Sequence, residues 1–137
     1  MKLTPRQTSW YLNSMIDHLT LTASDYEKSK AFYNRALAPL GYSLVKEFGD
    51  DVAGFGIGDR LDFWLANGPK ATSPVFHLAF VAESRAQVDA FYEAALAAGG
   101  RDNGKPGTRE NYPPKYYCAF VLDPDGQNIE ATCRAAT

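Results

Sequence analysis

The sequence predicts an α+β fold that is built from two copies of one strand–helix–three-strand unit. When residues 15–41 are laid over residues 74–100, at an offset of 59, 10 of the 27 positions are identical without a gap, which indicates an internal duplication. The two histidines of the chain, His18 and His77, fall on each other in this alignment. A length of 137 residues is that of one ordinary domain, so both copies should share one core.

The first copy opens with an expected strand over 16–22. Ser24 and Glu27 have the spacing of a capping box and predict the start of a helix, which Pro39 and Gly41 should end. Three short strands are expected after it, over 42–48, 52–57 and 61–66. Residues 67–74 are expected to link the two copies.

The second copy repeats this order, with a strand over 75–82 and a helix that begins after Ser84, the first residue of a second capping box. Gly99 and Gly100 should end the helix. Strands follow over 101–105, 116–122 and 127–133, with a long irregular loop over 106–115 and an Asp-Pro-Asp-Gly turn over 123–126. We therefore expect one domain over 15–133, with modules at 15–66 and 75–133, preceded by an N-terminal arm or a vector-derived remnant over 1–14.

Composition excludes several classes of partner. The net charge is −2 and no run of five basic residues occurs, whereas a nucleic-acid-binding face needs clustered lysine and arginine. No stretch approaches the roughly 20 apolar residues of a membrane helix, and the N-terminus lacks the apolar segment of a signal peptide. We expect a cytoplasmic protein, with Cys118 and Cys133 as reduced thiols, and with neither nucleic acid nor membrane as a partner.

Strand alternation gathers polar side chains on one concave face. The residues expected on it are His18, His77, Glu130, Asp62 and Trp64. Two imidazoles and a carboxylate in one pocket suit Zn²⁺, Fe²⁺, Mn²⁺ or Ni²⁺, and an open coordination position would polarise a bound oxygen. Glycines 54, 56 and 58 share a face of their strand and could leave room there for a ligand.

At these residues the chain resembles the vicinal oxygen chelate superfamily, which includes glyoxalase I, fosfomycin-resistance enzymes, extradiol dioxygenases and bleomycin-resistance proteins. The resemblance covers roughly residues 15–133, and its motifs are Met15-Ile16-Asp17-His18-Leu19, Phe76-His77-Leu78-Ala79-Phe80 and Asp123-Pro124-Asp125-Gly126-Gln127-Asn128-Ile129-Glu130. It implies two βαβββ modules that form a half-open barrel around a divalent ion.

The resemblance implies three metal ligands, namely His18, His77 and Glu130. Aligning Leu61-Asp62 with Ile129-Glu130 makes Asp62 the counterpart of Glu130 and a candidate fourth ligand, through water. A His-His-Glu set is more similar to the fosfomycin-resistance or dioxygenase pattern than to glyoxalase I. Similarity to glyoxalase I further implies that Glu130 alternates between metal ligand and catalytic base.

Three other residues are candidates for binding a substrate. Trp64 is either a packed aromatic residue or a wall of the pocket. Arg109, expected on the irregular loop, either holds an anionic group in its guanidinium fork or is a solvated charge. Strand parity allows one of Tyr116 and Tyr117 to face the pocket, and we expect Tyr116. Cys118 as a nucleophile is disfavoured, because no base is assured beside it.

The expected function is that of a divalent-metal-dependent, glyoxalase-like enzyme acting on a small oxygen-bearing substrate, in which the metal stabilises an enolate or alkoxide. The alternative is a non-catalytic protein that sequesters a drug or metabolite, as bleomycin-resistance proteins do. The resemblance also implies a homodimer. The site could form within one chain or across two chains.

Overall fold

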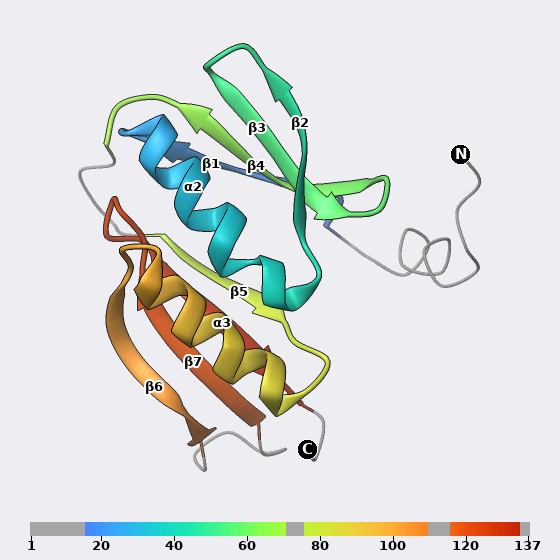
Figure 1. The fold of residues 1–137 in the computed structure, drawn as a ribbon, viewed down its shortest axis with the longest axis vertical. Coiled ribbons are helices and arrows are strands. Elements are labelled where there is room, and N and C mark those ends of the chain that lie inside the picture. The colour runs from blue at the N-terminus through green and yellow to red at the C-terminus, as the bar shows by residue number, and fades with distance from the viewer. Residues whose placement is uncertain (1–15, 71–75, 110–115, 135–137) are drawn as a thin grey trace.

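A computed structural model describes residues 16–70, 76–109 and 116–134 (Figure 1). Its elements repeat one order twice, a strand, a helix and three strands. In chain order they are β1 (Leu19–Ala23), α2 (Tyr26–Ala36), the 3₁₀ turn η1 (Ala38–Leu40), β2 (Ser43–Phe48), β3 (Val52–Ile57), β4 (Arg60–Asn67), β5 (His77–Val81), α3 (Arg85–Ala97), β6 (Arg101–Arg109), β7 (Tyr116–Leu122) and β8 (Asn128–Cys133). The expected arm over 1–14, and parts of the expected linker and loop, lie outside the described residues.

The two copies form two four-stranded sheets with the same strand order. The first sheet runs β1-β4-β3-β2 and the second runs β5-β8-β7-β6. In each sheet the first strand pairs in parallel with the last, and the remaining pairs are antiparallel. The predicted α+β fold of two βαβββ modules is therefore confirmed. The sheets remain two separate sheets and do not close into a barrel.

The helices α2 and α3 lie side by side and join the two modules (Figure 1). Phe32 and Tyr33 of α2 and Val88 and Phe91 of α3 are all fully buried and belong to one hydrophobic cluster with both sheets. A single core of this kind indicates that the modules fold as one domain. None of the described helices is long and apolar enough to cross a membrane.

The two helices begin differently, although both sequences have the form of a capping box. In α3 the Ser84 hydroxyl accepts a hydrogen bond from the Gln87 amide at 3.2 Å, as predicted. In α2 the cap is Asp25, which accepts from the Lys28 amide at 3.2 Å, so the prediction of Ser24 was wrong by one residue. Ser24 is instead bonded to the other module.

The Asp-Pro-Asp-Gly turn of the second module contacts the first module. The Tyr33 hydroxyl of α2 donates to Asp123 at 2.5 Å, where both groups are buried. The backbone amide of Ser24 donates to Asp125 at 2.8 Å, and the Ser24 hydroxyl donates to the same carboxylate. We call these two contacts, Tyr33 to Asp123 and Ser24 to Asp125, the module latch. Burial raises the pKa of Asp123, and the Tyr33 donor acts in the opposite direction.

The strand β6 is longer than predicted and changes the position of Arg109. It continues to Arg109, past two irregularities in its pairing with β7. Pro106 fits there because β6 is an edge strand, where a missing amide donor costs little. The expectation that Arg109 lies on an irregular loop was therefore wrong, since it ends a strand opposite Tyr116.

Candidate functional site

His77 and Glu130 come together on neighbouring strands of the second sheet. His77 begins β5, and Glu130 lies in β8, opposite Ala79. The Nε2 atom of His77 is 3.1 Å from Oε1 of Glu130. The Glu130 side chain is only 8% exposed, whereas that of His77 is 49% exposed, so solvent reaches the pair from the imidazole side.

A backbone carbonyl orients the His77 ring. The Nδ1 atom is 3.1 Å from the carbonyl oxygen of Asn128. Because a carbonyl only accepts, Nδ1 carries a proton and Nε2 is directed at Glu130. Such a contact to the second ring nitrogen is the usual way in which a metal-binding imidazole is oriented.

Burial raises the pKa of Glu130, and the neighbouring His77 opposes this rise. Without a metal, the short contact between Nε2 and Oε1 needs one proton between them. The pair can therefore hold a proton and release it when a cation replaces it.

His18 does not join this pair within one chain. Its Nδ1 atom is 2.7 Å from Oδ1 of Asp17, and both side chains are largely exposed. Across the described ranges, no group of three or more His, Cys, Asp or Glu side chains is placed to hold a metal ion. The chain thus brings together two of the three predicted ligands, and the predicted three-ligand site is not assembled within it.

The strand register makes Trp64, and not Asp62, the counterpart of Glu130. Glu130 lies opposite Ala79, two residues after His77, and Trp64 lies opposite Thr20, two residues after His18. The alignment of Asp62 with Glu130 was therefore wrong, because it matched similar residue types and not equivalent ladder positions. The first module thus has an indole where the second has a carboxylate.

The Trp64 indole also fills the space expected above the glycines of β3. A Cβ atom at Gly54 would lie 2.6 Å from Cζ3 of Trp64, and one at Gly56 would meet the backbone oxygen of Arg60. The ring of Trp64 also stacks on that of Phe48, with centroids 6.2 Å apart. The expectation of open room for a ligand at Gly54 and Gly56 was wrong. These glycines allow close packing.

Tyr116 and Arg109 lie on the sheet face that carries Glu130. Tyr117 points to the opposite face, where its hydroxyl donates to Asp89 of α3 at 2.5 Å, so strand alternation places Tyr116 on the Glu130 face, as predicted. The Arg109 guanidinium lies 5.6 Å from the ring centroid of Phe120. Sequence reasoning missed Arg134, which lies just past the last predicted strand and stacks over Tyr116 at 5.0 Å.

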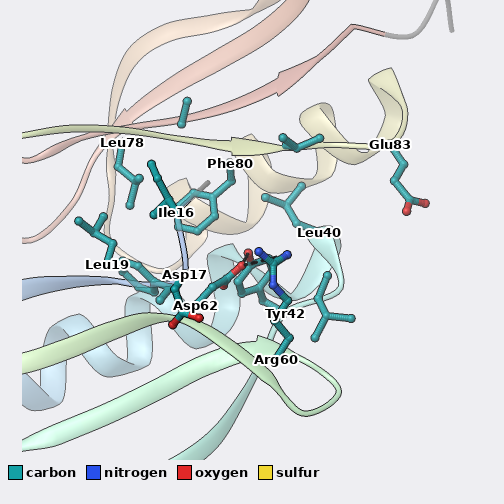
Figure 2. A pocket seen from close by; sticks show the side chains of 14 residues that line it. Ile16, Asp17, Leu19, Leu40, Tyr42, Arg60, Asp62, Leu78, Phe80 and Glu83 are labelled. Atoms are coloured by element: carbon teal, nitrogen blue, oxygen red, sulfur yellow. Dashed lines mark hydrogen bonds and ion pairs between the residues drawn. The ribbon is translucent and has the colours of Figure 1, made fainter. Parts of the chain in front are cut away.

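A separate pocket of about 690 Å³ lies between the modules (Figure 2). Most of its walls are apolar side chains of β1, β4 and β5, among them Leu19, Phe63, Leu78 and Phe80. None of the three predicted ligands lines it, although Ala79, the strand neighbour of Glu130, does. Its size falls within the range of roughly 300–1,000 Å³ typical of small-molecule sites.

One corner of this pocket is polar. Tyr42 donates to Oδ2 of Asp62 at 3.0 Å, and Nη1 of Arg60 lies 3.8 Å from the same oxygen, as Figure 2 illustrates. Oδ1 of Asp62 is buried and has no hydrogen-bond partner among the described residues. Burial raises the pKa of both Asp62 and Tyr42. The sequence pointed to Asp62, but it gave no signal for Tyr42, which precedes β2 and reaches β4 only in the folded chain.

Comparisons with known proteins agree with this fold. A protein-family model described as the Glyoxalase/Bleomycin resistance protein/Dioxygenase superfamily matches residues 15–131. A search of curated proteins gave no match.

Three solved structures illustrate the similarity. A glyoxalase/bleomycin resistance protein from Albidiferax ferrireducens T118 is 30% identical, with a TM-score of 0.75, and the match covers 88% of this chain and 99% of that one. A protein of the glyoxalase/bleomycin resistance protein/dioxygenase family from Burkholderia phytofirmans PsJN has a TM-score of 0.69 at 17% identity, covering 89% and 100%. A lactoylglutathione lyase from Agrobacterium tumefaciens has a TM-score of 0.63 at 22% identity, covering 88% and 93%. At these lower identities the likeness concerns the fold alone.

Proposed function

Because this chain belongs to the glyoxalase, bleomycin resistance protein and dioxygenase superfamily, we propose that it binds a divalent metal ion and acts on a small oxygen-bearing substrate. The observation that carries the proposal is the contact of 3.1 Å between His77 and Glu130, with the imidazole oriented by the Asn128 carbonyl. Imidazole nitrogen and carboxylate oxygen suit Zn²⁺, Ni²⁺, Mn²⁺ or Fe²⁺. The donor set therefore fits such an ion.

The third proposed ligand is His18 of a second copy of the chain. Within one chain His18 is bonded to Asp17, a contact that leaves its Nε2 atom available. Exposed apolar side chains support a homodimer. Ile16 and Val81, both on the wall of the inter-module pocket, are 64% and 78% exposed. A second copy that covered them would remove apolar surface from water.

A bound metal would polarise an oxygen of the substrate and lower the cost of an enolate or alkoxide. Glu130 would act as the base that moves the proton, because its carboxylate lies at the site where the substrate oxygen would bind. Trp64, Arg109 and Tyr116 remain candidates for orienting the substrate.

Metal analysis of protein purified without a metal-affinity column tests the proposal. We expect one ion per chain, with affinity lowered at least about tenfold in His77→Ala and Glu130→Gln. Glu93→Gln, which changes an exposed carboxylate of α3, is the matched control and should bind normally. An unmodified protein that binds no ion at stoichiometric levels would refute the proposal.

Mixing two defective variants tests whether the site is shared between chains. His18→Ala and His77→Ala should each lose the metal, but a heterodimer of the two would contain one intact site made from His18 of one copy and His77 of the other. We expect one ion per heterodimer. A site formed within one chain would leave the heterodimer empty, and light scattering that showed a 15.1 kDa species would exclude the shared site.

A second candidate function is sequestration of a small molecule without chemistry. The inter-module pocket favours it, since its walls are mainly apolar and it lies apart from His77 and Glu130. An apolar probe that bound equally to metal-free protein, and whose binding was abolished by Leu78→Arg but not by Glu130→Gln, would support sequestration. The enzyme proposal requires binding that depends on Glu130.

A further inference from the structure

Two arginines lie on the sheet face of the His77–Glu130 pair, and in the part of the chain that the structure describes neither has a carboxylate partner. Arg109 donates a hydrogen bond from Nη2 to the Lys105 carbonyl at 3.0 Å. Arg134 contacts the ring of Tyr116. Among the described residues, neither guanidinium forms an ion pair within 4.0 Å of an acidic side chain. A guanidinium has five donors, and toward the described residues most of those on both side chains have no partner.

The strand register places both arginines on the face of the pair. Phe120 of β7 lies opposite Glu130 of β8. The Phe120 ring centroid is 5.9 Å from that of His77 and 5.6 Å from the Arg109 guanidinium. Arg134 directly follows β8 and stacks over Tyr116, which lies on the same face. Both arginines lower the pKa of Glu130, which agrees with their proximity.

Glycines in β6 make room for the Arg109 guanidinium. A Cβ atom at Gly107 would lie 3.1 Å from its Nη1 atom, and one at Gly104 would lie 3.5 Å from Nη2 and 2.9 Å from Phe120. Without side chains at these positions, the guanidinium lies over the strand and against the aromatic ring. Stacking of this kind holds the planar fork in place and leaves its edge directed outward.

The charge on this face is unbalanced. Two guanidinium groups and one carboxylate lie on it, and a metal ion held by His77 and Glu130 would add further positive charge. A ligand that lies here therefore needs negative charge. Guanidinium groups bind carboxylates and phosphates through paired hydrogen bonds.

We propose that Arg109 and Arg134 form an oxyanion subsite beside His77 and Glu130, so that the substrate carries a carboxylate, phosphate or phosphonate group. The inference rests on the proposed function, since it names the chemical class of the molecule that would lie at that site. The simpler alternative is that the arginines only neutralise Glu130.

Binding of inorganic phosphate and of benzoate to metal-free protein, by calorimetry at constant ionic strength, tests the subsite. We expect saturable binding, weakened roughly tenfold or more in Arg109→Gln and in Arg134→Gln and lost in the double variant. Arg101→Gln removes the same charge from the other end of β6 and should bind like the wild type. Circular dichroism and melting would show that the variants remain folded.

The outcomes separate the two proposals. Anion binding in a protein that never takes up metal would refute the metal proposal and leave the subsite standing. Metal binding without saturable anion binding, or equal weakening in Arg101→Gln and Arg109→Gln, would overturn the subsite. Binding of phosphate alone, or of benzoate alone, would support it and identify the type of oxyanion.

Discussion

Replacing Tyr33 by phenylalanine removes one hydrogen bond of the module latch and little else. The Tyr33 ring is fully buried, and its hydroxyl donates to Asp123, which is 3% exposed. The variant leaves a buried carboxylate without one of its donors. A hydrogen bond to a charged group contributes about 1.5–3 kcal/mol, so we expect a loss of about 2 kcal/mol in the free energy of unfolding. For a chain of this size, that corresponds to a fall of roughly 8 °C in Tm.

The stability lost in Tyr33→Phe should depend on pH, and the ionisation of Asp123 determines whether the loss grows or shrinks as the pH rises. Burial raises the folded-state pKa of Asp123, and the Tyr33 donor lowers it, so removing the donor raises this pKa further. In the folded variant Asp123 therefore keeps its proton to a higher pH than it does in the unfolded chain. The stability of the variant falls as the pH rises from the unfolded pKa of Asp123 to its folded pKa. We expect the cost of Tyr33→Phe to be larger at pH 7 than near pH 4.

Tyr26→Phe is the matched control on the same helix. Tyr26 is 5% exposed, and its buried hydroxyl has no hydrogen-bond partner among the described residues. Removing it should be neutral or slightly stabilising, because no bond is lost. Urea and thermal unfolding of both variants at the two pH values would decide the matter. A Tyr33→Phe cost no larger than that of Tyr26→Phe would refute the reasoning.

Two further predictions concern the first module. Gly54→Ala should cost roughly 1–3 kcal/mol in urea unfolding, since its Cβ would lie 2.6 Å from the Trp64 ring. Adding Trp64→Leu should recover part of the loss, and strictly additive costs would contradict this packing argument. Burial raises the pKa of Asp62 in the folded protein above its ordinary value of about 4. The contribution of Asp62 to wild-type stability therefore falls as the pH rises from about 4 through the folded pKa. Asp62→Asn should remove that contribution and gain stability relative to the wild type over this window, and parallel pH profiles for the two proteins would contradict this.

The fold could be predicted because the duplication and the strand alternation gave the same answer. Seven of the eight strands begin and end within about three residues of the predicted bounds, and β6 is the exception. Pro106 and Gly107 indicated the start of a loop, but the edge position of β6 tolerates both. Whether a strand lies at an edge depends on tertiary pairing, which a single sequence does not specify.

The site could be predicted only in part, for related reasons. His77 and Glu130 share one sheet, so strand parity was enough to bring them together. His18 lies directly before β1, in the other module, and its distance from the pair depends on how modules and copies are arranged. The pairing of Asp62 with Glu130 failed because residue type was used in place of the hydrogen-bond register. Arg134 was missed because it lies outside the predicted strand.

The module latch has a consequence for synthesis. Tyr33 and Asp123 are 90 residues apart in sequence, and Ser24 and Asp125 are 101 apart. At a translation rate of roughly 5–20 residues per second, α2 exists for about 5–18 s before its partner in the turn has been made. During that time the Tyr33 hydroxyl lacks its native acceptor, and the side of α2 that packs against α3 has no native cover. We therefore expect the first module to remain incompletely folded on the ribosome until the turn that carries Asp123 and Asp125 emerges.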